Sequence, residues 1–208
     1  VVLILMITCR AGCREGSNEP TITGRTKGLG TDTLYLYGMD ELYDRIDTIY
    51  VENDKFSYTT SVDTITSAYL LLKNRIEYPV FLDKGNKIKI KGDTINLNFL
   101  TISGNIYNEE FTDFQKALED PADPSEKAGE ETVDKRITVE KANTAEEMAE
   151  EFILQHHSSY VSLYLLDKYF VQKETPDFSK IKKLVEVMTG VLQDKPYIER
   201  LNETITQA

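Results

Sequence analysis

Cysteine, histidine and tryptophan are scarce in this chain, and their scarcity narrows the chemistry that it can perform. The 208 residues contain two cysteines, two histidines and no tryptophan. The cysteines are Cys9 and Cys13, so no CxxC motif occurs and no thiol follows residue 13. A thiol:disulfide oxidoreductase attacks its substrate through a cysteine thiolate. The sequence therefore argues against redox catalysis by this chain itself.

Basic residues are outnumbered by acidic ones, with 24 lysines and arginines against 35 aspartates and glutamates. The net charge is −11, and the segment from Glu119 to Glu151 alone contributes −8 of it. Such a chain repels a phosphate backbone, which disfavours nucleic acid as a partner. With 40% hydrophobic residues, the chain still has enough apolar material to bury a core.

The sequence has no long hydrophobic run. Its most apolar stretch, "VVLILMIT", covers only residues 1–8, whereas a membrane helix needs about 20 apolar residues. The stretch is typical of the core of a secretory signal peptide. Since neither a basic stretch nor an initiator methionine precedes it, we expect the sequence to begin inside the signal, with residues 1–13 as its remaining part.

A cysteine directly after such a core is typical of a bacterial lipoprotein signal, in which that cysteine is lipidated. Cys13 follows Ala11 and Gly12, which fits, although Arg10 stands where an aliphatic residue is usual. Cys9 is a looser match, and a disulfide between the two cysteines is a further alternative. We predict lipidation of Cys13, or alternatively Cys9, a tether over residues 14–20, and a lipid-anchored location in the cell envelope, facing the periplasm or the cell surface.

Residues 21–104 show the alternation typical of β-strands. In "KIKIK", Ile88 and Ile90 point to one face and Lys87, Lys89 and Lys91 to the other. An apolar run around residues 67–74 predicts a central strand. Turn signals at residues 52–55 and 83–86 predict two hairpins. Short strands of this kind favour an antiparallel β-sandwich or a barrel-like module.

From residue 105 the apolar period changes to that of a helix. Asn108 is the expected N-cap of the first helix. An acidic loop is expected near residues 119–135, and Thr144 with Glu147 has the spacing of a capping box at a helix start. The sequence therefore predicts an α+β fold in which the β module is followed by a small helical region, residues 105–208, of three to four helices.

The order of these segments resembles a known family. "TITGRTKGLGTDTLYLYG", "IDTIYVENDKFSYTTSVD", "VFLDKGNKIKIKGD" and "LTISGNIYNEEFTDF" together are similar to the DUF4369 domain of Bacteroidetes lipoproteins. The resemblance extends from residue 21 to about residue 207 and carries no catalytic signature. It implies that a thioredoxin-like domain of the thiol:disulfide interchange, AhpC/TSA or TlpA type follows this region in such proteins.

Other residues that could perform chemistry have simpler explanations. His156 and His157 are adjacent, so they point about 100° apart on a helix and cannot easily bind one metal. Glu146, Glu147, Glu150 and Glu151 are typical of a solvated helix face. Tyr35, Tyr37, Tyr50 and Tyr58 could line a ligand-binding sheet face, but such tyrosines are more often cross-strand pairs with their hydroxyls in water. Lys87, Lys89 and Lys91 could bind an anion, but exposed lysines on strands are common. We assign no catalytic, cofactor-binding or metal-binding residue.

These observations predict a non-catalytic accessory region of an envelope lipoprotein. In the setting implied by the resemblance, it would position a downstream thioredoxin-like domain, select its partners or support a homo-oligomer. The alternative is a stand-alone lipoprotein that binds a ligand or a partner without redox activity.

Overall fold

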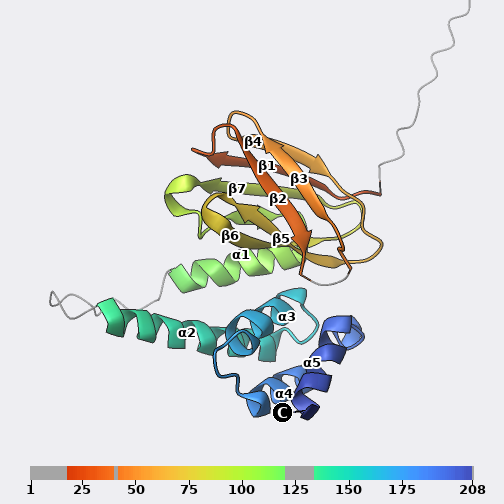
Figure 1. The fold of residues 1–208 in the computed structure, drawn as a ribbon, viewed down its shortest axis with the longest axis vertical. Coiled ribbons are helices and arrows are strands. Elements are labelled where there is room, and N and C mark those ends of the chain that lie inside the picture. The colour runs from red at the N-terminus through yellow and green to blue at the C-terminus, as the bar shows by residue number, and fades with distance from the viewer. Residues whose placement is uncertain (1–17, 40–41, 120–133, 208) are drawn as a thin grey trace, which may run out of the picture.

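The computed structural model describes residues 18–39, 42–119 and 134–207 (Figure 1). Cys9, Cys13 and most of the expected acidic loop lie outside these residues, so the predictions about them stay predictions. The α+β fold class is confirmed, with an N-terminal β module of two sheets that do not close into a barrel.

The β module consists of eight strands in two four-stranded sheets. Sheet A has the order β4-β1-β7-β8 and sheet B the order β3-β2-β5-β6. The strands are β1 (Thr21–Lys27), β2 (Asp32–Gly38), β3 (Ile46–Val51), β4 (Lys55–Thr59), β5 (Thr66–Leu72), β6 (Ile76–Leu82), β7 (Lys87–Asp93) and β8 (Thr101–Ser103). The predicted central position of β5 is confirmed. All pairs are antiparallel except that of β1 with β7, which is parallel.

The two predicted hairpins are wrong. The turn after β3 leads into β4, and the turn after β6 leads into β7, so each connection crosses from sheet B to sheet A. At residues 52–55 only Glu52 and Lys55 form a bridge. A turn between two alternating segments looks the same in sequence whether the segments pair or separate into facing sheets. The expected backbone of the first turn is confirmed, since Asn53 and Asp54 have φ of 50° and 67°.

The alternation predicted for β7 is confirmed. Ile88 and Ile90 are buried between the sheets, while Lys87, Lys89 and Lys91 are exposed on the outer face of sheet A. Ile22 of β1 and Leu36 of β2 are fully buried in the same core. Burial of one such side chain stabilises the fold by about 1.5–3 kcal/mol. The core is therefore formed by one face of each sheet, as in a sandwich.

The described part of the helical region contains five α-helices, where three to four were expected. They are α1 (Ile106–Glu119), α2 (Asp134–Gln155), α3 (Tyr160–Leu166), α4 (Phe178–Val187) and α5 (Pro196–Gln207), and a π-helical turn (Asp167–Val171) extends α3. The start of α2 was expected at Thr144 but lies at Asp134. The segment between them has no proline or glycine and is rich in good helix formers, so the helix continues through the capping signal.

Helix α1 closes one side of the sandwich, where β6 and β8 are the last strands of their sheets (Figure 1). The buried Asn108 side chain accepts from the N–H of Phe81 at 3.0 Å and donates to its carbonyl at 2.8 Å. One turn later, Thr112 accepts from the N–H of Ile102 at 3.0 Å and donates to its carbonyl at 2.9 Å. Two side chains thus satisfy backbone groups of both edge strands.

The expected role of Asn108 as the N-cap of this helix is therefore wrong. Helix α1 begins two residues earlier, and the side chain of Asn105 accepts from the backbone N–H of Asn108 at 3.0 Å. Asn105 is thus the residue that satisfies the first turn. Asn108 is free to bond the sheet because it lies inside the helix.

Candidate functional site

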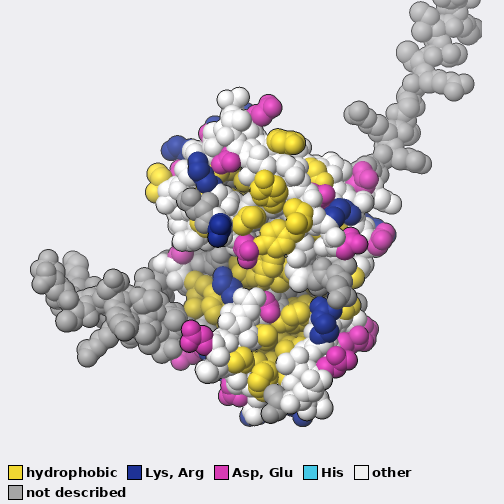
Figure 2. Space-filling view, in the orientation of Figure 1, with side chains coloured by type: hydrophobic (Ala, Val, Ile, Leu, Met, Phe, Trp, Pro, Cys, Tyr) yellow, Lys and Arg dark blue, Asp and Glu magenta, His cyan; other side chains and the backbone are white. Residues whose placement is uncertain are grey.

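The outer face of sheet B exposes aromatic and aliphatic side chains. Tyr50 is 73% exposed, Ile46 72% and Tyr35 41%. Pairing of the strands places Ile46, Tyr37 and Tyr69 in one row across β3, β2 and β5. We call these five residues the aromatic face. Figure 2 shows hydrophobic side chains gathered in the middle of the molecule, over this sheet and onward to the helices.

Tyr37 and Tyr69, the two tyrosines of this row, contact neighbouring side chains. The Tyr37 hydroxyl donates to Glu77 on β6, and burial, followed by this bond, raises the pKa of Tyr37. The Tyr37 and Tyr69 rings lie 5.7 Å apart, and Tyr69 contacts Tyr164 of α3 at 6.3 Å. Burial also raises the pKa of Tyr69. These phenols therefore stay neutral. Their contacts join the aromatic face to β6 and to helix α3.

Tyr58, which was considered together with the other tyrosines, lies elsewhere. It belongs to β4 in sheet A and hydrogen-bonds Asp47. It therefore contributes to a polar cluster at the start of β3 rather than to the aromatic face.

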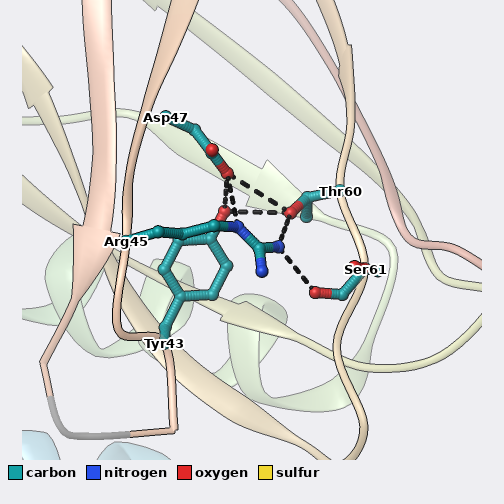
Figure 3. Close-up of polar contacts among 5 residues, drawn as sticks. All are labelled: Tyr43, Arg45, Asp47, Thr60 and Ser61. Carbon is teal, nitrogen blue, oxygen red and sulfur yellow. Dashed lines mark hydrogen bonds and ion pairs between the residues drawn. The ribbon is translucent and has the colours of Figure 1, made fainter.

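That cluster ties together two connections of the β module (Figure 3). The guanidinium of Arg45 donates to Asp47 at 3.2 Å, to the Thr60 hydroxyl at 2.6 Å and to the Ser61 carbonyl at 2.7 Å. The Tyr43 hydroxyl donates to Asp47 and lies 2.9 Å from the Thr60 hydroxyl. We call these five residues the loop clasp, because they join the segment before β3 to the segment after β4.

The electrostatics of the loop clasp favour a structural role. Burial alone would raise the pKa of Asp47, but hydrogen bonds from Tyr43, Tyr58 and Arg45, with the charge of Arg45, outweigh it and lower that pKa. Burial and the bond to Asp47 raise the pKa of Tyr43. The buried Thr60 hydroxyl lies within hydrogen-bonding distance of Tyr43, Arg45 and Asp47. Arg45 and Asp47 therefore bond each other, and the groups around Asp47 stabilise its ionised form.

A second surface lies on the outer face of sheet A. Strand pairing places Lys55, Arg25 and Lys91 next to one another on β4, β1 and β7. Lys87 and Lys89 project from the same face of β7. We call these five residues the basic face. Arg25, Lys55, Lys89 and Lys91 also line a shallow groove of about 310 Å³.

A small cavity lies between the sandwich and the helices. Its volume is about 20 Å³, and it is lined by Met39, Ser67, Leu163, Asp167 and Tyr197. The Tyr197 hydroxyl donates to Asp167 at 2.6 Å, and burial, followed by this bond, raises the pKa of Tyr197. A volume of this size holds roughly one water molecule and no larger ligand.

Both histidines lie just past the end of α2 at Gln155. The ring of His156 stacks on Phe152 with centroids 4.0 Å apart, and the carbonyl of His157 accepts from the N–H of Thr189. The neighbouring Ser159 caps α3, and its hydroxyl donates to Glu110 at 2.5 Å. These contacts hold the turn between α2 and α3.

Two carboxylates of α2, Glu146 and Glu150, form ion pairs with lysines that follow α3 in the chain. Lys180 of α4 lies 2.7 Å from Glu150 and 3.5 Å from Glu146, and Lys173 pairs with Glu146. The bond to Glu150 is the main reason that the pKa of Lys180 is raised. Within the described residues, no three histidine, cysteine or acidic side chains are grouped so that they could hold a metal ion.

The predicted lipidation residues Cys13 and Cys9 lie outside the described ranges, so the structure does not place them. Among the helices that the structure does describe, none is long and apolar enough to cross a bilayer.

Comparison with known proteins matches the β module to one family. Residues 21–111 match the family described as "Domain of unknown function (DUF4369)". The match covers all eight strands and the first turns of α1, and this description gives no sign of catalytic activity. Neither the curated proteins nor the solved structures contain a significant match. Residues 21–111 of this chain thus form a DUF4369 domain.

Proposed function

We propose that this chain is the non-catalytic accessory part of an envelope lipoprotein and that its aromatic face contacts a protein partner. Lipidated Cys13, or alternatively Cys9, would hold it at a membrane, facing the periplasm or the cell surface. The partner implied by the sequence resemblance is a thioredoxin-like thiol:disulfide oxidoreductase domain downstream in the same protein. The accessory part would position that domain or select the proteins on which it acts.

The exposed aromatic face is the observation that supports this proposal. Tyr50 and Ile46 leave more than two thirds of their surface in water, although both side chains gain free energy when they are buried. Tyrosine has few rotatable bonds and combines apolar area with a hydroxyl, which is why aromatic residues are enriched in protein interfaces. The backbone of both residues is already ordered in strand β3. Binding would therefore cost little backbone conformational entropy.

The polar clusters of the described residues support contact rather than catalysis. The charged groups of the loop clasp bond one another, and Glu146 and Glu150 of α2 pair with a lysine of the helical region. In addition, no cysteine follows residue 13. A disulfide-exchange step therefore has to come from another domain.

The test is a titration of the full chain with the thioredoxin-like domain encoded in frame downstream, made as a separate polypeptide. Isothermal calorimetry should show binding by the wild-type chain. The double variant Ile46→Ala and Tyr50→Ala should weaken it by about tenfold or more, as expected when central interface side chains are removed.

Thr48→Ala is the matched control, because Thr48 is an exposed residue between these two on the same face of β3. It should change the affinity by less than about twofold. Equal affinities of the wild type and the double variant would contradict the proposal, as would an open reading frame without such a domain. Turnover of a disulfide substrate by the chain alone would contradict its non-catalytic role.

A further inference from the structure

The basic face runs against the overall charge of the molecule. Arg25 on β1 stands between Lys55 on β4 and Lys91 on β7, so three cations are direct neighbours across three strands. Like charges placed directly opposite each other destabilise a sheet. The chain as a whole carries −11. This arrangement therefore needs an explanation beyond average surface composition.

No carboxylate in the described ranges neutralises this row. The seven ion pairs found there include neither Arg25, Lys55, Lys89 nor Lys91. The nearest pair on the sheet joins Lys27 to Asp93 at 3.6 Å, at the C-terminal ends of β1 and β7, two residues beyond Arg25 and Lys91. The four side chains that line the groove are thus available to an anionic ligand.

Protection of a sheet edge does not explain these charges. Lysines often prevent edge strands from pairing with other molecules. However, β1 and β7 are the two inner strands of sheet A, and only β4 and β8 lie at its edges. Arg25, Lys89 and Lys91 therefore stand in the middle of the face.

We infer that the basic face docks on the phosphate groups of an anionic lipid surface. This inference rests on the lipid anchor in the proposed function. Thr21, the first residue of β1, follows Cys13 by eight residues, which span at most about 28 Å when fully extended. An anchored chain would thus keep sheet A within reach of the headgroups, where each lysine or arginine adds to the attraction.

The shape of the groove and the position of the acidic residues agree with this occupant. The groove is shallow and lined by long exposed cations, which suits many weak contacts to a flat surface better than one enclosed anion. Helix α2, which carries Glu146, Glu147, Glu150 and Glu151, lies beyond α1 from the sheets (Figure 1). At physiological salt their repulsion is screened over about 8 Å.

The test is a vesicle flotation assay with the full chain that carries no lipid. Binding is compared between vesicles of phosphatidylcholine alone and vesicles that also contain phosphatidylglycerol. The ratio of the two partition coefficients removes the contribution of the apolar N-terminal residues, which is common to both. The wild type should prefer the anionic vesicles, and the preference should fall as salt is added.

The variant Lys89→Gln with Lys91→Gln should reduce this preference by about tenfold or more. Lys182→Gln with Lys183→Gln, two exposed positions on α4, removes the same charge elsewhere and should change it by less than about twofold. Circular dichroism checks that both variants fold.

An equal loss in both double variants would overturn the inference, and so would a wild type that does not distinguish the two vesicles. Saturable binding of inorganic phosphate without vesicle preference would also overturn it, since it would indicate a site for a free anion. Because the assay contains no partner domain, its outcome is independent of the binding measured through Ile46 and Tyr50.

Discussion

At the scale of single residues, Asn108 and Thr112 show how two polar side chains can complete a sandwich. Each lies on the inner side of α1 and bonds both the N–H and the carbonyl of one edge residue, Phe81 or Ile102. The sequence could not predict these roles. Asn108 is a common type of capping residue, and its actual partner is 27 positions away in the chain.

We predict that removal of either side chain destabilises the fold strongly. Thr112→Val keeps the shape but leaves the backbone N–H and carbonyl of Ile102 without these partners. Asn108→Ala removes the partner of the buried Phe81 N–H, while the Phe81 carbonyl keeps its bond from Asn105 at 2.8 Å. An unsatisfied buried group costs about 1–3 kcal/mol, so each variant should lower the free energy of unfolding by at least about 2 kcal/mol. Urea denaturation measures the difference.

Thr101→Val is the control for this experiment, because Thr101 is an exposed residue of β8 next to Ile102. It should change stability by less than about 0.5 kcal/mol. If Thr112→Val were equally neutral, helix α1 would not be satisfying the edge of sheet A.

At the scale of elements, periodicity identified the strands but not their partners. In β7 the alternation of lysine and isoleucine gave the buried face correctly, because side chains on a strand alternate whatever lies beside it. The turn at residues 83–86 carries no such information. Whether β6 and β7 pair depends on which distant strands they meet, and β7 lies beside β1 instead.

The loop clasp stabilises two of these connections, and its contribution depends on pH. The folded pKa of Asp47 lies below its ordinary value of 3.8. Its stabilising effect is therefore fully present above about pH 4 and is lost as the pH falls through the folded pKa. Asp47→Asn should lower the free energy of unfolding by about 1–2 kcal/mol at neutral pH.

The same variant should flatten the loss of stability as the pH falls below about 4. Asp63→Asn, a change at an exposed aspartate in the segment after β4, serves as the charge-matched control and should keep the wild-type profile. Urea midpoints measured across this range decide the matter, and parallel profiles for the wild type and Asp47→Asn would refute the role of the carboxylate.

At the scale of the whole molecule, both candidate surfaces arise from pairings that a linear sequence does not display. In the sequence, Lys87, Lys89 and Lys91 are ordinary exposed strand lysines. Strand pairing places Arg25 of β1 and Lys55 of β4 beside them. Of the four tyrosines singled out, three share the aromatic face, while strand order sends Tyr58 to the other sheet. The sequence shows the residue types of both surfaces, but it does not show that these residues lie together in space.

The same long-range packing predicts that the sheets and the helices unfold together. Tyr164 of α3 contacts Phe111 of α1 at 5.1 Å and Tyr69 of sheet B at 6.3 Å, so one buried ring joins the two parts. Tyr164→Ala should lower the free energy of unfolding by about 3 kcal/mol or more because it leaves a cavity. Tyr50→Ala, at an exposed ring, should cost far less.

Urea unfolding followed by far-ultraviolet circular dichroism and by tyrosine fluorescence should give one midpoint for the wild type. The same coincidence at lower urea is expected for Tyr164→Ala, since a shared core makes the transition cooperative. Helical signal that disappears well before the fluorescence change, in the wild type, would show instead that the helical region is an independent unit and that Tyr164 does not couple the two parts.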